Sequence, residues 1–200
     1  MKRRQLLAYG ATALSGLGTS GFAQGKYPQR TVTLVVPTPP GGSTDFTARL
    51  IVEPLTRALG QPVIVDNRPG ASGNIGNQFV ARAKPDGYTL LMAYSGYQVG
   101  NPHLFKDAGW DPLKDFVPVA MVTRAPQVFA IPNALPVNSL QELIAYAKKN
   151  PGKLNYASSG NGSIQHIAGE LFKQLTGTFI THIPYRGSGP AVQDLLAGTV

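Results

Sequence analysis

The sequence contains no cysteine among its 200 residues. Disulfide bonds, thiolate catalysis and cysteine-ligated metal sites are therefore excluded, and stability has to come from an ordinary hydrophobic core. Beyond the first residues, no stretch is long and apolar enough to cross a membrane as a helix. The length suffices for one large domain or two small ones. We therefore expect a soluble protein with one or two apolar cores.

Acidic residues are few, since 10 Asp and Glu stand against 18 Lys and Arg, which gives a formal net charge of +8. Residues 1–23 hold three of these cations and no acid, so the rest of the chain carries 15 cations, 10 acids and a net charge of +5. Its basic residues are scattered, with Lys148-Lys149 as the only adjacent pair. Nucleic-acid binding is typical of a basic stripe or cluster, so no nucleic-acid partner is predicted. A mild positive field instead favours small anionic ligands.

Residues 1–23 show the pattern of a secretory signal peptide. A basic start (Lys2, Arg3 and Arg4) precedes an apolar stretch from Leu6 to Leu17 and the small-x-small cleavage pattern Gly21-Phe22-Ala23. The apolar stretch is too short and too interrupted by polar residues to span a bilayer. Two arginines before two leucines fit twin-arginine export as well as general secretion, and both routes stay open. An exported protein is predicted.

Strand-like and helix-like segments alternate along the rest of the chain. Strands are expected at 31–36, 63–67, 88–94, 117–123, 127–131, 154–158 and 178–185. Helices are expected at 44–59, from Ser139 to about 150, at 164–175 and at 190–196, and a further short helix should end near residue 83. Pro54 should kink or split its helix. The series predicts an α/β fold with largely parallel sheets covered by helices, and the strands within 117–131 are interpreted as a crossover between two lobes.

Three loops of similar composition each follow a strand and open a helix. They are "PTPPGGSTD" (37–45), "YASSGNGS" (156–163) and "PYRGSGP" (184–190). In open α/β sheets, ligands bind outside the carboxyl ends of the strands, where a helix N-terminus offers free N–H donors and a positive dipole end. These parts suit a carboxylate or a phosphate. The hydroxyl residues could instead only cap helices, but three similar loops favour a site.

Sharper catalytic and nucleotide-binding motifs are missing. G-x-G-x-x-G occurs only at 16–21, inside the signal peptide, and there is neither a P-loop nor a G-x-S-x-G elbow. His103, His166 and His182 lack the spacing of a zinc helix and are expected to be structural. No paired nucleophile and base is recognised near the three loops. Binding without chemistry, metal or cofactor is therefore predicted.

Single charged residues near the loops leave some alternatives open. Asp45 could act as a general base, although an acid at a helix start is ordinary dipole compensation. Arg68 and Arg186 lie in glycine-rich loops near strand ends, where either could neutralise an anion. A secreted α/β hydrolase or lyase using Asp45 or His166 as its base is the main enzymatic alternative.

Several long blocks in order carry a resemblance to a known family. They are "VPTPPGGSTD", "QPVIVDNRPGASGNIG", "PDGYTLL", "DPLKDFVPVA", "PGKLNYASSGNGSIQHIAGELFK" and "IPYRGSGPAVQDLLAG". From about Tyr27 to its last residue, the chain closely resembles the tripartite tricarboxylate transporter substrate-binding receptors, also called the Bug family. The resemblance implies a periplasmic-binding-protein-like fold, in which two α/β lobes close like a flytrap on a small organic carboxylate. The implied partners are a membrane permease with a large and a small integral subunit.

The resemblance also implies site residues and boundaries. Gly42, Ser43 and Thr44 from the first lobe, Ser158, Asn161 and Ser163 from the second, and Tyr94 and Ser95 at the variable end would contact the ligand. The lobes would span residues 24–122 and 123–200 of a monomeric periplasmic protein. Members continue for roughly half again this length, so the chain is expected to be C-terminally truncated. Marginal stability or exposed strand edges should follow. A receptor that signals to a membrane kinase is an alternative to transport.

Overall fold

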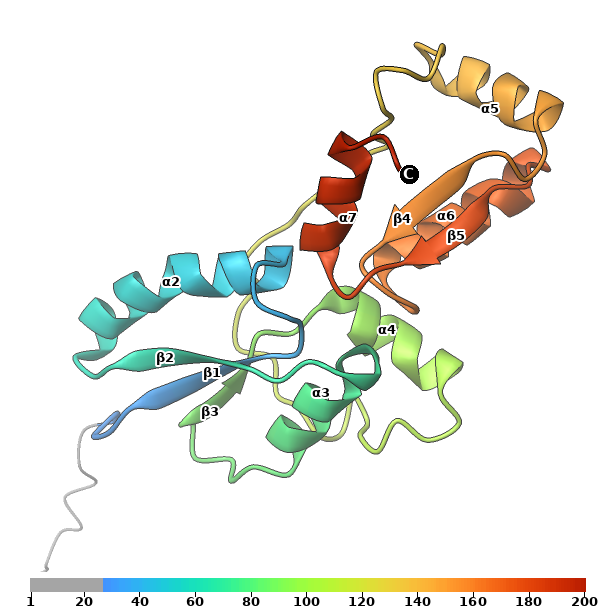
Figure 1. Ribbon diagram of the computed structural model, residues 1–200. Helices are drawn as coiled ribbons and strands as arrows, with labels where there is room; N and C mark the ends of the chain where they lie inside the picture. Colours follow the sequence, from blue (N-terminus) through green and yellow to red (C-terminus); the bar gives the residue numbers. More distant parts are fainter. Residues whose placement is uncertain (1–26) are drawn as a thin grey trace, which may run out of the picture.

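The structure, a computed structural model, describes residues 27–200. The predicted signal peptide at residues 1–23 lies outside this part of the chain. Two α/β lobes follow one another along the sequence, and a long connection without helices or strands joins them (Figure 1). Both sheets are parallel, so the predicted fold class is confirmed.

The first lobe is a three-stranded sheet with helices on both faces (Figure 1). It contains β1 (Val32–Val36), α2 (Ser43–Leu59), β2 (Val63–Asn67), the 3-10 helix η1 (Ala71–Gly73), α3 (Asn74–Ala81), β3 (Thr89–Leu91) and α4 (Ser95–Leu104). The strand order is β2-β1-β3. Because β1 pairs with a strand on each side and is covered on both faces, its sequence "VTLVV" is almost entirely apolar and β-branched.

The core of the first lobe centres on β1. Val32 and Val36 are fully buried and pack with Ala48 of α2, Val63 of β2 and Met92 beyond β3. Partly buried side chains along α2 extend this cluster. The carboxyl end of β1 therefore lies on a rigid base, and the loop that follows it starts from a fixed point.

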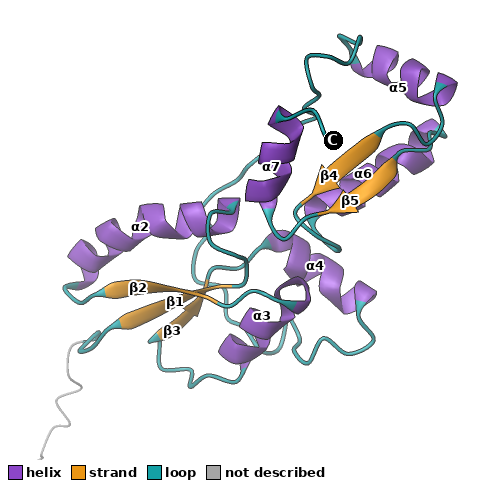
Figure 2. Ribbon diagram, in the orientation of Figure 1, coloured by secondary structure: helices purple, strands orange, loops and turns teal. Residues whose placement is uncertain are grey.

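The second lobe is smaller and has two strands in the described part of the chain. It contains α5 (Leu140–Lys149), β4 (Asn155–Ser158), α6 (Ile164–Thr176), β5 (Thr181–Pro184) and α7 (Ser188–Leu196). β4 and β5 pair in parallel, with Asn155 opposite Thr181 and Ser158 opposite Pro184. Figure 2 shows α6 along this small sheet and α7 between it and the first lobe. Each strand has a single neighbour in this sheet, so both are edge strands.

The connection between the lobes differs from the sequence prediction. The strands predicted at 117–123 and 127–131 are wrong, because the segment forms neither helix nor strand. Its apolar residues are exposed, with Val119 at 82% and Val128 at 79%. Strand formation needs a neighbouring strand to pair the backbone and a surface to cover the side chains. Neither is available to this segment among residues 27–200.

Two helices also differ from the sequence prediction. Pro54 does not split α2, which runs as one helix from Ser43 to a left-handed C-cap at Gly60. The helix α4 was not predicted, since Gly96, Gly100 and Pro102 are helix-breaking residues. Its glycines are needed for close packing, because a Cβ at Gly96 would come within 3.1 Å of the backbone nitrogen of Ile164. The predicted N-cap of α5 is confirmed, with Glu142 N–H donating to Ser139 Oγ at 3.2 Å, while the Glu142 carboxylate accepts from Asn138 N–H at 2.7 Å, one residue before the cap.

Candidate functional site

The carboxyl ends of β1, β4 and β5 point toward the space between the lobes, and a small cavity of about 20 Å³ lies there. Its wall comes from both lobes and consists of Thr38, Gly42, Ser43, Thr44, Tyr94, Tyr97, Ser159, Gly187 and Ser188. None of these nine residues is charged. The volume admits about one water molecule. A molecule larger than water can therefore enter only when the lobes move apart.

A larger recess of about 460 Å³ lies at the opposite end of the first lobe, between the start of the described chain and the end of α2. Tyr27, Pro28, Gln29, Leu59, Gly60 and Gln61 line it. It is remote from the three glycine-rich loops and from every strand's carboxyl end. We therefore place the candidate site at the smaller interlobe cavity, where strand ends and helix N-termini meet.

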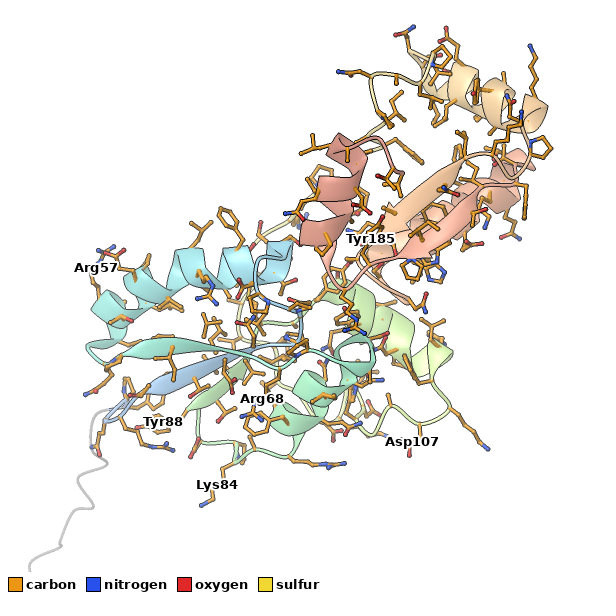
Figure 3. The ribbon with its side chains drawn as sticks, in the orientation of Figure 1. Arg57, Arg68, Lys84, Tyr88, Asp107 and Tyr185 are labelled. Atoms are coloured by element: carbon orange, nitrogen blue, oxygen red, sulfur yellow. The ribbon has the colours of Figure 1, made fainter. Side chains whose placement is uncertain are left out.

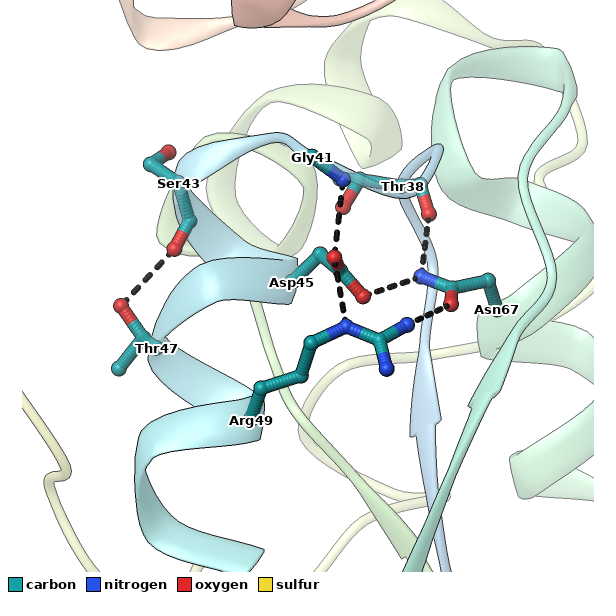
Figure 4. Close-up of polar contacts among 7 residues, drawn as sticks. All are labelled: Thr38, Gly41, Ser43, Asp45, Thr47, Arg49 and Asn67. Atoms are coloured by element: carbon teal, nitrogen blue, oxygen red, sulfur yellow. Dashed lines mark hydrogen bonds and ion pairs between the residues drawn. The ribbon is translucent and has the colours of Figure 1, made fainter.

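The loop 37–45 is held in place by the carboxylate of Asp45 (Figure 4). Asp45 Oδ2 accepts from Gly41 N–H at 2.8 Å and from Arg49 Nε at 3.0 Å, and its Oδ1 accepts from Asn67 Nδ2 at 2.9 Å. Asn67 Nδ2 also donates to the carbonyl of Thr38 at 3.2 Å. The loop is thereby tied to α2 and to the end of β2. Asp45 acts as a structural anchor of this loop.

The protonation state of Asp45 fits this role. Burial alone would raise its pKa, but the hydrogen bonds from Arg49, Gly41 and Asn67 outweigh burial and hold the pKa below its ordinary value. The carboxylate is 3% exposed and each oxygen is already engaged. The alternative that Asp45 serves as a general base is therefore not supported by the geometry.

The N-terminus of α2 receives its cap from the other lobe. The N-cap residue is Gly42, which has no side chain to accept a hydrogen bond, so Ser43 and Thr44 do not cap this helix as the sequence suggested. Instead Ser43 N–H donates to Ser188 Oγ of the second lobe at 3.3 Å. Gly42 has an ordinary φ of −78°, so glycine is not needed for the backbone. A Cβ there would lie 3.7 Å from Ser188 Oγ and 3.9 Å from Thr38 Oγ1.

The N-terminus of α6, in the second lobe, contacts a hydroxyl of the first lobe. Tyr94 of the first lobe accepts from Ile164 N–H at 3.0 Å, and its hydroxyl lies 3.3 Å from Gln165 Oε1, to which it donates. Within the second lobe, Ser163 Oγ caps the helix by accepting from His166 N–H at 3.3 Å. Burial raises the pKa of Tyr94, so this hydroxyl stays protonated. Each lobe thus supplies a hydroxyl to a helix N-terminus of the other.

A third polar contact joins the lobes beside these two. Ser72 Oγ donates to the carbonyl of Asn161 at 2.9 Å. Ser72 has a positive φ of 53°, a conformation uncommon outside glycine, and its own carbonyl accepts from Asn101 Nδ2 at 2.8 Å. Opening of the cavity has to break these four interlobe hydrogen bonds, two of them made by Tyr94, each contributing about 1 kcal/mol.

The loop 156–163 rests on a pair of histidines. Ser158 Oγ lies 2.6 Å from His182 Nε2, and the His182 ring stacks on His166 with centroids 4.2 Å apart. His166 Nδ1 in turn accepts from Gly162 N–H at 3.2 Å. Burial and the neighbouring His166 lower the pKa of His182. The two imidazoles therefore hold both ends of the loop, which agrees with the prediction that the histidines are structural.

The Ser158–His182 pair corrects the statement that no nucleophile and base lie near the loops. Its geometry nevertheless favours structure over catalysis. Ser158 is 1% exposed, and its hydroxyl also accepts from Gly160 N–H at 3.1 Å within the same loop. A nucleophile has to reach a substrate, and Ser158 is not on the wall of the cavity.

The structure places the eight predicted site residues in two groups. Gly42, Ser43, Thr44 and Tyr94 line the cavity, whereas Ser95, Ser158, Asn161 and Ser163 do not. Ser95 is exposed at the start of α4, and the other three hold the loop or its contact with the first lobe. Ligand contact by any of the eight stays a prediction.

Sequence reasoning missed the other wall residues for different reasons. Thr38, Ser159, Gly187 and Ser188 lie in the three glycine-rich loops, so the loop composition signalled their region but not their orientation. Tyr97 lies in α4, which was not predicted as a helix. Because α4 starts at the carboxyl end of the third strand, correct assignment of this helix would have pointed to its first turn.

Charged side chains stay away from the cavity wall. Arg68 is bound to Asp66 at 2.7 Å and lies 3.6 Å over the ring of Phe79, and Figure 3 shows it beside α3. Arg186 is exposed and is not part of the wall. Neither arginine neutralises an anion in this arrangement. Any anion in the cavity would be held by N–H groups and hydroxyls.

Among residues 27–200, no helix combines the length and the apolar character that a bilayer crossing requires. Within the same range, no group of three or more His, Asp or Glu side chains could hold a metal ion.

Comparison with known proteins adds a family and several relatives. The model of the family described as "Tripartite tricarboxylate transporter family receptor" matches residues 47–200. The chain is 45% identical to protein BugT of Bordetella pertussis over 175 residues, which is 87% of this chain and 54% of BugT. Family and relatives agree with the resemblance inferred from the sequence blocks.

Solved structures agree with the fold. A structure described as R. palustris Rpa4515 with adipate has a TM-score of 0.83 and 44% identity, covering 87% of this chain and 58% of that one. MatC (Rpa3494) from Rhodopseudomonas palustris with bound malate has a TM-score of 0.80 and 38% identity, covering 87% of this chain and 59% of that one. This chain therefore spans a little over half the length of the relatives that it matches.

Proposed function

Because the chain belongs to the tripartite tricarboxylate transporter family of receptors, we propose that it captures a small organic carboxylate in its interlobe cavity and delivers the ligand to a membrane permease. The permease would be of the tripartite tricarboxylate type, with a large and a small integral subunit. The family is one of receptors and not of enzymes, as predicted. The proposed location is the periplasm and the proposed state is a monomer.

One observation carries this proposal, namely the composition of the cavity wall. A helix N-terminus with no side-chain cap of its own, that of α2, faces hydroxyls from the other lobe, and no charged residue intervenes. The positive dipole end of α2, and the Ser43 N–H once Ser188 has moved away, favour an anion. Hydroxyl donors suit the two oxygens of a carboxylate. The wall offers no lysine or arginine for the dense charge of a phosphate.

The ligands of two related structures narrow the class of organic acid to test for this chain. The names of the related structures mention adipate and malate, and both are dicarboxylates. We propose a small dicarboxylate as the first ligand to test for this chain. The alternative of a sensor that signals to a membrane kinase would use the same binding site, and no described residue favours it over transport.

Thermal unfolding in the presence of single organic acids tests capture. A ligand at about 100 times its Kd should stabilise the folded chain by about 2.7 kcal/mol, and chromatography should recover the acid unchanged. Gly42→Ala should fold normally, because the added Cβ makes only ordinary contacts of 3.6 Å or longer, but the methyl group fills space beside Thr38 and Ser188. We expect its affinity to fall at least about tenfold.

Thr31→Ala is the control for that variant, because Thr31 is exposed just before β1 and lies off the wall. It should bind as the unaltered chain does. Failure of every carboxylate to bind, or turnover of the acid, would overturn the receptor proposal. Delivery needs a separate assay: uptake by vesicles that contain the large and small permease subunits should require added receptor.

A further inference from the structure

The hydroxyl groups of the cavity wall differ in whether they already have partners. Tyr94 accepts from Ile164 N–H and donates to Gln165, and Ser159 Oγ also donates to Gln165 Oε1, at 3.0 Å. Each of these two hydroxyls therefore already donates its one hydrogen to another group of the protein. A ligand that approached either of them would have to compete with an existing hydrogen bond.

Four other wall hydroxyls, those of Thr38, Ser43, Thr44 and Tyr97, make no hydrogen bond among residues 27–200, and Thr38 and Tyr97 are the more enclosed two. Thr38 Oγ1 is a buried atom without a partner. Tyr97 is 6% exposed as a residue, and its hydroxyl, which is not among the fully enclosed atoms, makes no hydrogen bond within the described chain. A fully buried polar atom is nearly always paired, so the Thr38 oxygen calls for an explanation, and the Tyr97 hydroxyl is a donor still available at the same place. Both residues line the same cavity, which points to a ligand.

The position of the Tyr97 ring is fixed by its neighbours. The ring packs so closely on Gly73 that a Cβ there would come within 2.3 Å of Tyr97 Cδ2. On another side, the Tyr94 ring meets it edge to face, with centroids 4.9 Å apart and planes 86° apart. Tyr97 is therefore held as a rigid donor rather than as a mobile side chain.

The charge state of Tyr97 makes it a donor at every physiological pH. Burial, with a smaller contribution from Tyr94, raises the pKa of Tyr97 to about 12. The hydroxyl keeps its proton and carries no charge. A neutral donor fixed in a buried wall suits an acceptor oxygen on the ligand, whereas it offers little to a methyl or methylene group.

We propose that Tyr97 is a specificity-determining residue that donates a hydrogen bond to a second acceptor of the ligand, while Thr38 and the α2 N-terminus hold the first carboxylate. The site would thus select acids with a second carboxylate or a hydroxyl over plain monocarboxylates of similar length. This inference rests on the proposed function, since it names the ligand class of the same cavity.

The two subsites follow from what lies beside each hydroxyl. Thr38 Oγ1 belongs to the loop that leads into α2, and a Cβ built on Gly42 would lie 3.9 Å from it, so Thr38 and the Ser43 N–H serve one group. Tyr97 belongs to α4, a different element from that loop, and its ring packs edge to face on Tyr94. A site built to hydrogen-bond a substrate group rejects analogues without that group, because its own polar atom is then left unpaired.

The test compares a dicarboxylate with a monocarboxylate of the same carbon count, namely adipate and hexanoate, by calorimetric titration of the full chain. Tyr97→Phe should weaken adipate binding about tenfold, the worth of one buried hydrogen bond. Hexanoate binding should be unchanged, so the preference for adipate falls by the same factor. Because the lost hydroxyl has no partner in the ligand-free chain, the melting temperature without ligand should not fall.

Tyr146→Phe is the matched control, since Tyr146 lies in α5, outside the cavity wall. It should bind both acids as the unaltered chain does. An equal loss of both acids in Tyr97→Phe, or no loss of either, would overturn the inference and leave the receptor proposal intact. If the unaltered chain binds neither these acids nor any other carboxylate, the receptor proposal itself fails.

Discussion

The two lobes are built from the same strand–loop–helix unit but bury it to very different depths. In the first lobe, β1 has a strand on each side, and Val32, Val35 and Val36 are fully buried. In the second, both strands are edges and no residue of α6 is buried. Leu171 and Leu175 of that helix are 51% and 77% exposed.

The comparison teaches how each lobe fixes its loops. A parallel sheet becomes stable when its strands are paired on both sides and covered on both faces. The first lobe meets this condition, so its loop 37–45 starts from an apolar core. The second lobe depends more on polar contacts, such as Ser158 with His182 and Tyr185 with Asp194. We expect the second lobe to unfold first.

The largest effect should come from a core deletion in the first lobe. Leu34→Ala removes a side chain that is 4% exposed in the central strand, and we expect a loss of about 2–5 kcal/mol in the free energy of unfolding. Leu171→Ala makes the same chemical change in α6, where it should cost about 0.5 kcal/mol or less. Denaturant titration of both variants measures the contrast. Equal losses would show that the lobes are equally packed.

The next effect concerns the anchor of the first-lobe loop. Asp45→Asn removes the charge that Arg49 and two N–H donors hold, and we expect a loss of about 1–3 kcal/mol. The pKa of Asp45 is depressed in the folded chain, so its stabilisation is present above the ordinary carboxyl range and is lost as pH falls through the folded value. Equilibrium unfolding as a function of pH should show this loss near pH 4 and below. A flat Asp45→Asn difference across that range would contradict it.

The loop of the second lobe should respond in a different pH window. Because the pKa of His182 is lowered in the folded chain, the unfolded chain binds the proton more readily. Stability should therefore be complete above about pH 6.5, the ordinary histidine pKa, and should fall as pH drops below it. His182→Gln should remove this dependence while Asp45 still titrates lower. Amide exchange at residues 159–163 would locate the loosening in the second lobe.

The smallest effect concerns the contact that joins the lobes at α2. Ser188→Ala removes the acceptor of Ser43 N–H, and we expect a cost of about 0.5–1.5 kcal/mol to the closed arrangement. Neither core is touched, so denaturant midpoints should barely move, whereas small-angle scattering should report a larger mean radius. Gln193→Ala, elsewhere in α7, serves as the control. An unchanged radius in Ser188→Ala would separate this contact from closure.

Much of the fold was readable from the sequence because its signals are local. Alternation of β-branched and helical segments, the Ser139 cap and the glycine-rich loops all agree with the structure. The errors lie where neighbours decide. Residues 117–131 have strand composition but lack a strand to pair with. The helix α4 contains helix breakers, yet its glycines let it pack against the second lobe.

The candidate site was predicted in part for a similar reason. Loop composition pointed to the region of Gly42, Ser43 and Thr44, because three glycine- and hydroxyl-rich loops each open a helix after a strand. It could not distinguish hydroxyls that face the cavity from those that hold the loop. Serine is a residue type typical of ligand contacts, but the Ser158 hydroxyl bonds to His182 and the Ser163 hydroxyl accepts from the α6 backbone. Only the orientation of each side chain separates the two roles.

The Ser188 hydroxyl, which accepts from the N-terminus of α2 in the other lobe, has a consequence for the rates of ligand capture and release. A ligand held at the proposed site by the Ser43 N–H would compete with Ser188 for this donor, so it would bind only during the fraction of time in which that contact is open, and its apparent affinity would be reduced by that fraction. Departure is eased in return. As the acid leaves, Ser188 can take back the donor, so the helix end passes from one acceptor to another without waiting for water. The Ser188 contact would therefore lower the affinity for the ligand and raise the rate of its release.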